Sequence, residues 1–195
     1  MVLFNSFKKL KAKNATWKEQ AVSNLLSKNE TILDYGCGDL LFAQELLKNN
    51  SSLKITGVDV VSAPKSRHIK FIKYKGDKLP FKENSFDTVI SVYVFHHCKD
   101  AKIAFADCLR VAKKRVIFIE AIAKNKMEIY PMKFMDWFFN VWKPEPIPLT
   151  FQFKTISEWR SIFKGLKVKK AKGKEIKNPI KLMPISEAYL FEVYK

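Results

Sequence analysis

The sequence predicts an α/β fold: a Rossmann-like, doubly wound sheet that is mostly parallel, with an antiparallel C-terminal strand and helices on both faces. Two observations support this prediction. Nearly continuous apolar runs are separated by segments of helical periodicity, as in a parallel sheet that is covered on both faces. The first of these runs ends in Gly36-Cys37-Gly38 and leads directly into a helical segment, as the ligand-binding turns of open α/β sheets do.

Size and composition limit the class of protein. The chain has 195 residues, 47% of them hydrophobic, which suits one folded domain over 1–195. The formal net charge of +17 favours contact with nucleic acid, an anionic membrane or an acidic partner. The lysines are spread along the chain, however, which also suits a solvated surface. Three cysteines without a CxxC pair indicate neither a disulfide framework nor a zinc ribbon. No apolar run approaches the roughly 20 residues of a membrane span, so we expect a cytoplasmic protein.

The first half of the chain supplies most of the alternation. A helix is expected over 17–28, where Ala21, Leu25 and Leu26 have helical spacing, and a buried strand over 31–35. A helix over 40–49 then precedes a strand over 53–61. Residues 68–74 alternate apolar and polar side chains with period two, which is typical of a strand nearer a sheet edge.

The second half continues the pattern around one interruption. A long apolar strand is expected over 85–95, a helix over 101–112 and a strand over 115–122. A helix over 155–166, with a capped start at Ser157, is followed by two paired strands over 167–176 and 187–195. Residues 123–154 are too long for an ordinary α/β loop, so we interpret them as an inserted apolar segment. Within it, "PMKFMDWFFNVW" predicts a helix with Phe134, Trp137 and Phe138 on one face and Lys133 and Asp136 elsewhere.

The glycine turn and the next strand together indicate a cofactor site. Glycines at 36 and 38 let the chain turn sharply and let a ligand approach the backbone. A pyrophosphate-binding turn would carry a third glycine three residues after Gly38, where this chain has Leu41. Asp59 ends the strand over 53–61, 23 residues after Gly36, and an acid at that place can accept both hydroxyls of a ribose.

A third block completes a recognisable set of motifs. The stretches "LDYGCGDL" (33–40), "TGVDVV" (56–61) and "LPF…SFD…HH" (79–97) occur in this order. In order and spacing they resemble the class I S-adenosylmethionine-dependent methyltransferases, and most closely the small-molecule type that carries the third block. The resemblance covers about residues 15–122, and more loosely the segment "SEWRSIF" at 157–163.

The resemblance implies S-adenosylmethionine as methyl donor, with S-adenosylhomocysteine as product, and it implies roles for individual residues. Asp34 would hold the methionine end, Asp59 the ribose hydroxyls, and Val60 would flank the adenine. Where the family often has an acid that meets the adenine amino group, this chain has Lys75, so Asp77 or the backbone at 76–77 would take its place. The cofactor-binding residues implied in this way are Asp34, Gly36, Cys37, Gly38, Asp59, Val60, Gly76, Asp77, Ser91 and Val92.

The histidines are the candidates for chemistry. His96 and His97 follow the strand over 85–95, where the acceptor should arrive, and an imidazole can accept the acceptor's proton near neutral pH. Adjacent residues of an extended chain point in opposite directions, so at most one is expected to face the pocket, and a structural histidine is the alternative. We expect no metal site, because His96, His97 and Cys98 are consecutive and no other His or Cys has ligand spacing.

The inserted segment is the candidate for acceptor binding. It is interpreted as a lid that excludes water and contacts an apolar acceptor. An ordinary core segment over the sheet edge and a face lying on a membrane are the alternatives. The residues assigned to the acceptor are Tyr93, Glu120, Phe134, Trp137 and Phe138.

Together these observations predict methyl transfer to a small molecule by in-line displacement, with an apolar or lipid-like acceptor. Two alternatives stay open. The first is an RNA or protein methyltransferase that uses the basic surface, although the fourth strand is followed by "VFHHC" and not by the Asn/Asp-Pro-Pro-aromatic turn typical of base-amine methylation. Nucleic acid is therefore the less favoured partner. The second alternative is a cofactor-binding partner protein without catalysis.

Overall fold

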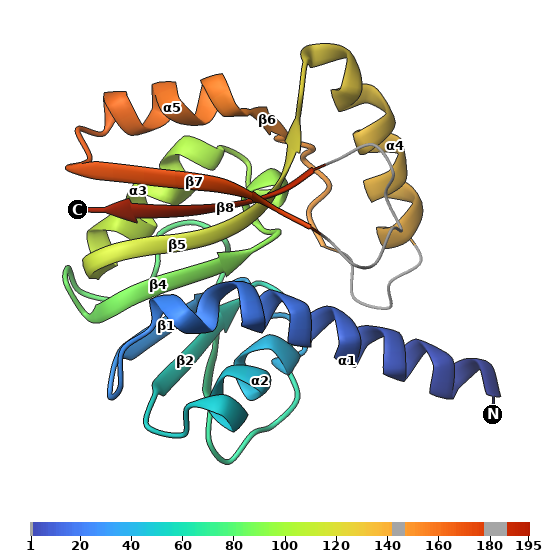
Figure 1. Ribbon diagram of the computed structural model, residues 1–195, viewed down its shortest axis with the longest axis vertical. Coiled ribbons are helices and arrows are strands. Elements are labelled where there is room, and N and C mark those ends of the chain that lie inside the picture. The colour runs from blue at the N-terminus through green and yellow to red at the C-terminus, as the bar shows by residue number, and fades with distance from the viewer. Residues whose placement is uncertain (1, 142–146, 178–186) are drawn as a thin grey trace.

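A computed structural model describes residues 2–141, 147–177 and 187–195, with backbone alone at 2–11, 139 and 187 (Figure 1). Its centre is an eight-stranded sheet in the order β3-β2-β1-β4-β5-β8-β7, and β6 pairs with β5 beside this path. The strands are β1 Thr31–Tyr35, β2 Lys54–Asp59, β3 Lys70–Lys73, β4 Phe86–Val92, β5 Ala112–Ala123, β6 Lys154–Thr155, β7 Lys170–Ile176 and β8 Glu187–Tyr194.

The strand directions confirm the predicted fold class. β1 to β6 pair in parallel, whereas β8 is antiparallel to both β5 and β7. The strand order reverses between β1 and β4, because β2 and β3 extend from β1 in one direction and β4 and β5 follow in the other. In open α/β sheets, ligands bind beyond the carboxyl ends of the strands at such a reversal. The fold therefore directs attention to the segments that follow β1, β2 and β4.

Helices cover both faces of the sheet, as predicted. α1 (Val2–Val22) and α2 (Leu41–Asn49) pack on one face, where Trp17, Phe42 and Leu46 are buried. α3 (Ala101–Val111) and α5 (Ile156–Gly165) pack on the other face. α4 (Ile129–Asn140) belongs to neither layer and lies beyond the carboxyl end of β5 (Figure 1).

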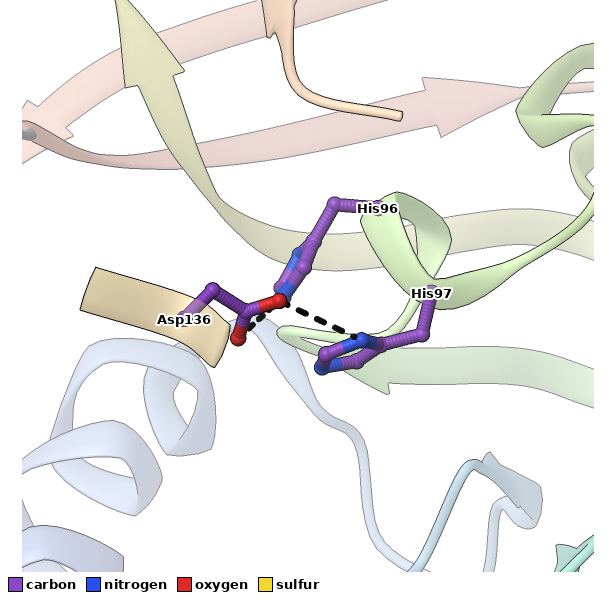
Figure 2. A group of neighbouring side chains, drawn as sticks. All are labelled: His96, His97 and Asp136. Atoms are coloured by element: carbon purple, nitrogen blue, oxygen red, sulfur yellow. Dashed lines mark ion pairs between the residues drawn. The ribbon is translucent and has the colours of Figure 1, made fainter. Parts of the chain in front are cut away.

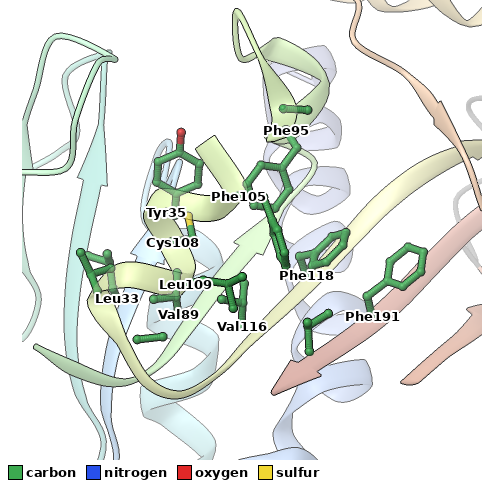
Figure 3. Close-up of a cluster of buried hydrophobic side chains, with 14 of the residues drawn as sticks. Leu33, Tyr35, Val89, Phe95, Phe105, Cys108, Leu109, Val116, Phe118 and Phe191 are labelled. Carbon is green, nitrogen blue, oxygen red and sulfur yellow. The ribbon is translucent and has the colours of Figure 1, made fainter. Parts of the chain in front are cut away.

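An aromatic core holds the strand ends that carry the candidate site (Figure 3). Phe118 of β5 lies 4.7 Å from Trp159 of α5 and stacks on Phe191 of β8, also at 4.7 Å between ring centroids. The ring of Phe95, which is fully buried, meets Phe118 edge-on at 5.2 Å. Because Phe95 begins the short helix η2 (Phe95–His97), this packing fixes the segment that follows β4.

Three of the boundaries that differ from the sequence prediction have a clear physical reason. α1 begins at Val2 rather than near residue 17, because its lysine-rich first half favours a helix without an apolar stripe. The strand expected over 85–95 ends at Val92, since Tyr93 has a φ of +58° and the chain then enters η2. α5 begins at Ile156 with a Thr155–Glu158 capping box, not at Ser157.

Two further expectations concern the inserted segment and the membrane. Residues 142–146 of the expected insertion and 178–186 of the final connection lie outside the described residues. The described part of the insertion contains η3 (Lys126–Glu128), α4 and β6. Among the described helices, none is long and apolar enough to cross a membrane.

Candidate functional site

The two glycines of the turn after β1 are present for different physical reasons. Gly36 has a φ of +74°, and a Cβ there would come within 2.3 Å of a Val94 methyl carbon, so the protein's own packing requires this glycine. Gly38 has a φ of +50°, but a Cβ there would meet nothing within 4 Å. The backbone at Gly38 therefore borders space that a ligand can occupy.

Asp59 connects this turn to the end of β2. Its Oδ2 accepts a 2.8 Å hydrogen bond from the backbone N–H of Gly38, and its Oδ1 accepts from the N–H groups of Val60 and Val61. The carboxylate thus holds the glycine turn and the start of the next loop together. Each carboxylate oxygen can accept more than one hydrogen bond, so contact with ribose hydroxyls stays a prediction.

Asp34 is a buried carboxyl at the carboxyl end of β1. It is 2% exposed, and its Oδ2 has no hydrogen-bond partner among the described residues. Burial, together with repulsion from Asp59, raises the pKa of Asp34 from 3.8 to about 7, while Lys18 of α1 opposes the rise. A cationic partner strongly stabilises the ionised form of a carboxyl that is buried in this way.

A second buried polar group lies on the neighbouring strand. Ser91 pairs with Tyr35, next to Asp34 in the register of β1 with β4. Its Oγ is also buried without a hydrogen-bond partner in the described chain. Buried polar atoms are nearly always satisfied in native proteins, so Asp34 and Ser91 fit a site that a polar ligand completes. The ammonium of a methionyl group matches the charge of Asp34, which makes these residues compatible with the expected cofactor.

The residues expected around the adenine gather beyond the ends of β2 and β3. Gly76 has a φ of +86°, and a Cβ there would lie 3.1 Å from a methyl carbon of Val60. This places the loop at 76–77 against the residue that follows Asp59. Asp77 itself is exposed, as is Lys75. Cys37 and Val92, the remaining expected cofactor residues, are buried and half-buried, and their contacts with a cofactor stay predictions.

Glu120, at the end of β5, organises the segment after β4. Its Oε1 accepts hydrogen bonds from the N–H groups of Val94 and Phe95, at 2.8 and 2.7 Å. Its Oε2 lies 2.6 Å from Nδ1 of His96. Glu120 is 2% exposed, so its oxygens serve the protein's own backbone and a histidine. This gives it a positioning role, whereas the predicted contact with an acceptor stays untested.

Both histidines face the same side chain, which corrects a sequence-based expectation. η2 is a helical turn and not an extended chain, so His96 and His97 do not point in opposite directions. Their ring centroids are 4.0 Å apart, and both rings approach Asp136 of α4 (Figure 2). Nε2 of His96 is 3.9 Å from Asp136 Oδ1, and Nδ1 of His97 is 3.7 Å from Oδ2. Asp136 is 3% exposed and accepts a hydrogen bond from Asn140.

α4 presents its opposite face to the surface. The side chains on this face are exposed by 60% (Phe134), 44% (Trp137) and 50% (Phe138). The ring centroid of Phe134 lies 6.0 Å from that of Trp137 and 6.4 Å from that of Phe138. This confirms that the three aromatics share one face, as the spacing predicted. Asp136 lies off this face, as expected, and is buried against η2. Met132 anchors the helix on Ala121, Ala123 and Phe153.

Tyr93 lies between the two halves of the site. It packs against the core under α1 and α2 and also against the cluster that anchors α4. The ammonium of Lys18 lies 5.0 Å from the centre of its ring. Tyr93 thus joins the core under α1 and α2 to the cluster that anchors α4, and its predicted contact with an acceptor stays a prediction.

Comparison with known proteins relates the chain to methyltransferases. The family model described as "Methyltransferase domain" matches residues 33–119, from β1 to β5. A curated relative, demethylmenaquinone methyltransferase of Thermotoga maritima, is 26% identical over 137 residues. That match covers 66% of this chain and 59% of the relative, so the chain spans less than two thirds of that protein.

Solved structures show the same fold. A methyltransferase in complex with the Trm112 activator from Haloferax volcanii superposes with a TM-score of 0.69 at 14% identity, covering 95% of this chain and 93% of that one. A phosphoethanolamine N-methyltransferase of Haemonchus contortus, bound to S-adenosylhomocysteine, gives 0.65 at 13% identity, covering 91% and 52%. These structures confirm the predicted fold, and the match to the methyltransferase-domain model agrees with the family and the cofactor class that the sequence motifs imply.

Proposed function

Because the chain belongs to the class I S-adenosylmethionine-dependent methyltransferases, we propose that it transfers a methyl group to a small-molecule acceptor that is apolar or lipid-like. The observation that carries the acceptor class is the surface of α4. Of the seven large apolar side chains exposed in the described residues, all but Ile103 lie between Met127 and Val141. They lie on η3, on α4 and at its C-cap, and the aromatics of α4 are on the face opposite to the one that meets the histidine cluster.

One relative supports the same acceptor class. The curated relative from Thermotoga maritima is named for a demethylmenaquinone, which is a quinone with an apolar chain. A concentrated apolar surface beside a methyl-transfer site suits such a molecule, since contiguous exposed apolar patches usually mark a binding surface. The same face of α4 could also rest on a membrane that contains the acceptor, and the net charge of +17 favours an anionic one.

The proposed chemistry assigns a task to each part of the site. The cofactor supplies a methyl group already activated by a positive sulfur. Asp34, Ser91 and the turn at 36–38 would bind its methionine end, and Asp59 its ribose. Tyr93 and α4 would shield the reacting atoms from water. The cluster of His96, His97 and Asp136 would receive the proton of an acceptor hydroxyl, while Glu120 holds His96 in place.

The test combines cofactor binding with turnover. Calorimetric titration with S-adenosylhomocysteine should show binding, and incubation with radiolabelled donor and a demethylated quinone should label the quinone. His97→Ala should slow transfer at least tenfold while cofactor affinity stays unchanged. His68→Ala, a change at the exposed third histidine, is the matched control. Unchanged rates for both His96→Ala and His97→Ala would assign these histidines a structural role. Cofactor binding without transfer to any acceptor would favour the non-catalytic alternative.

A second candidate acceptor is RNA, and β7 is the observation that favours it. Lys170, Lys172 and Lys174 recur with period two on this exposed edge strand and so share one face. Lysines also protect an edge strand from pairing with other chains, so the feature has a simpler explanation. Labelling of RNA, with binding that weakens as salt rises, would support this candidate. Absence of RNA binding at low salt would exclude it.

A further inference from the structure

We propose that His96, His97 and Asp136 form a binding site for a divalent transition metal between η2 and α4 (Figure 2). One ligand atom from each residue can be chosen so that all three lie within 4.8 Å of one another. Two imidazoles and one carboxylate are the ligand set of many three-residue metal sites that keep positions open. The earlier expectation of no metal rested on neighbouring His and Cys alone, and Asp136 comes from a helix about 40 residues further along the chain.

The pair distances are close to those of a filled site. Nε2 of His96 lies 3.9 Å from Asp136, and Nδ1 of His97 lies 3.7 Å from it. Metal–ligand bonds of about 2.0 Å in a tetrahedral site place ligand atoms roughly 3.3 Å apart. Small side-chain rotations close this difference. His97 Nδ1 also lies 3.1 Å from the carbonyl oxygen of Pro148, so a metal would take its Nε2, or its Nδ1 in exchange for that contact.

Glu120 supplies the support that metal-binding histidines usually have. Its carboxylate lies 2.6 Å from Nδ1 of His96, which places the proton on Nδ1 and directs the lone pair of Nε2 towards Asp136. A carboxylate behind a ligating histidine fixes the tautomer and increases the basicity of the ligand nitrogen. The ring of Phe153 stacks on His96 at 4.7 Å and holds the imidazole plane. The orientation of His96 is thus set before any ion arrives.

Charge balance points the same way. Glu120 and Asp136 are 2% and 3% exposed, and both lie against the ring of His96. His97 also approaches Asp136, so two imidazoles and two buried carboxyl groups meet between η2 and α4. Buried charges are costly unless they are paired or coordinate a metal. A bound cation would pair with these carboxyl groups while the imidazole nitrogens act as its ligands.

The ligand chemistry selects the kind of metal. Imidazole nitrogens suit Zn²⁺, Fe²⁺, Co²⁺ and Ni²⁺, whereas Mg²⁺ and Ca²⁺ prefer oxygen ligands. Three protein ligands leave at least one position for an oxygen from water or acceptor. The metal site itself is inferred from geometry, whereas its role in catalysis rests on the proposed function. With the metal bound, the histidines would act as ligands and not as bases, so a coordinated acceptor hydroxyl would lose its proton to solvent and its oxygen would form a bond to the methyl carbon. The carbon–sulfur bond breaks with its electron pair left on sulfur.

The test measures metal binding without any acceptor. Purified protein is stripped with a chelator and titrated with Co²⁺, whose visible absorption reports nitrogen and oxygen ligands. Wild type and His68→Ala should bind one equivalent, whereas His97→Gln and Asp136→Asn should bind at least tenfold more weakly. Calorimetry with Zn²⁺ provides the second measurement. Because the three cysteines could compete for either ion, a sulfur-to-cobalt charge-transfer band would assign the metal to a thiol and overturn the proposal.

Measurement of cofactor binding distinguishes a failure of the metal site from a failure of the proposed methyl transfer. Each variant is also titrated with S-adenosylhomocysteine, and unchanged affinity shows that the fold and the donor site are intact. Cobalt binding that is equal in wild type, His97→Gln and Asp136→Asn overturns the metal site and leaves the proposed methyl transfer standing. Loss of S-adenosylhomocysteine binding by the wild type would instead overturn the proposed function. Addition of Zn²⁺ or Co²⁺ should also raise transfer to a hydroxyl acceptor in wild type but not in Asp136→Asn.

Discussion

Asp34→Asn should stabilise the cofactor-free protein at neutral pH while removing its cofactor affinity. Burial and the charge of Asp59 raise the pKa of Asp34 from 3.8 to about 7. A raised carboxyl pKa means that the folded state binds the proton more tightly than the unfolded state does. The folded protein therefore has full stability below about pH 4 and loses stability as the pH rises to about 7.

The size of the effect follows from the same pKa. At about 1.4 kcal/mol for each pH unit between the two pKa values, ionisation of Asp34 destabilises the fold by about 4 kcal/mol at pH 8. At pH 5 the cost is under ~2 kcal/mol, since the folded carboxyl is still protonated there. Asparagine cannot ionise, so the advantage of the variant should grow by about 2–3 kcal/mol between pH 5 and pH 8.

Urea unfolding of wild type and variant at both pH values measures this growth, and it cancels any pH-independent effect of the amide. Asp39→Asn, at an exposed position in the same turn, is the control and should show no comparable growth. A stability difference for Asp34→Asn that is the same at pH 5 and pH 8 would refute the reasoning.

Whereas stability should fall as the pH rises, the affinity of the wild type for the cofactor should increase. A cationic methionine end binds the ionised carboxylate, so wild-type affinity for S-adenosylhomocysteine should rise about tenfold from pH 6 to pH 8. The variant should bind weakly at every pH. A flat wild-type profile would mean that Asp34 does not meet the ammonium.

The remaining predictions concern the turn, the ribose contact and the lid. Gly36→Ala should destabilise the protein by more than about 2 kcal/mol, because its methyl group meets Val94 at a positive φ, whereas Gly38→Ala should cost about 1 kcal/mol and chiefly weaken cofactor binding. Urea unfolding and calorimetry separate the two effects, and equal losses of stability would contradict the assignment of open space to Gly38. Asp59→Ala should remove most cofactor affinity; unaltered calorimetric binding would exclude its ribose role. Trp137→Ser should change stability by less than about 0.5 kcal/mol but raise the KM for an apolar acceptor, and an unchanged KM would count against acceptor contact by α4.

The sheet could be predicted from the sequence because its signals are local. The apolar run at 31–35 is followed by glycines at 36 and 38, and the next strand ends in Asp59, so strand, turn and acid are all readable in order. The structure places the first strand at the predicted residues and orders the others around it. What the sequence could not show is that both oxygens of Asp59 bond to backbone N–H groups, since these partners depend on the approach of two loops.

The histidine cluster could be predicted only in part. Adjacent histidines after a strand were visible, but their common direction follows from the helical turn that Phe95 anchors in the aromatic core. The helical spacing placed Asp136 off the aromatic face of the helix, without indicating what it would contact. Its burial depends on how α4 docks against η2, and helical periodicity contains no information on that docking.

The two faces of α4 join acceptor binding to the chemistry of the cluster. One face exposes Phe134, Trp137 and Phe138, and the other places Asp136 against His96 and His97. An acceptor that seats on the aromatic face can therefore favour the docked position of the helix, in which Asp136 completes the cluster. Acceptor binding and metal binding to the completed cluster are then linked, and each should strengthen the other by the same free energy. If this coupling holds, an apolar acceptor should tighten Co²⁺ binding in wild type, and Trp137→Ser should reduce that gain while leaving metal binding without acceptor unchanged.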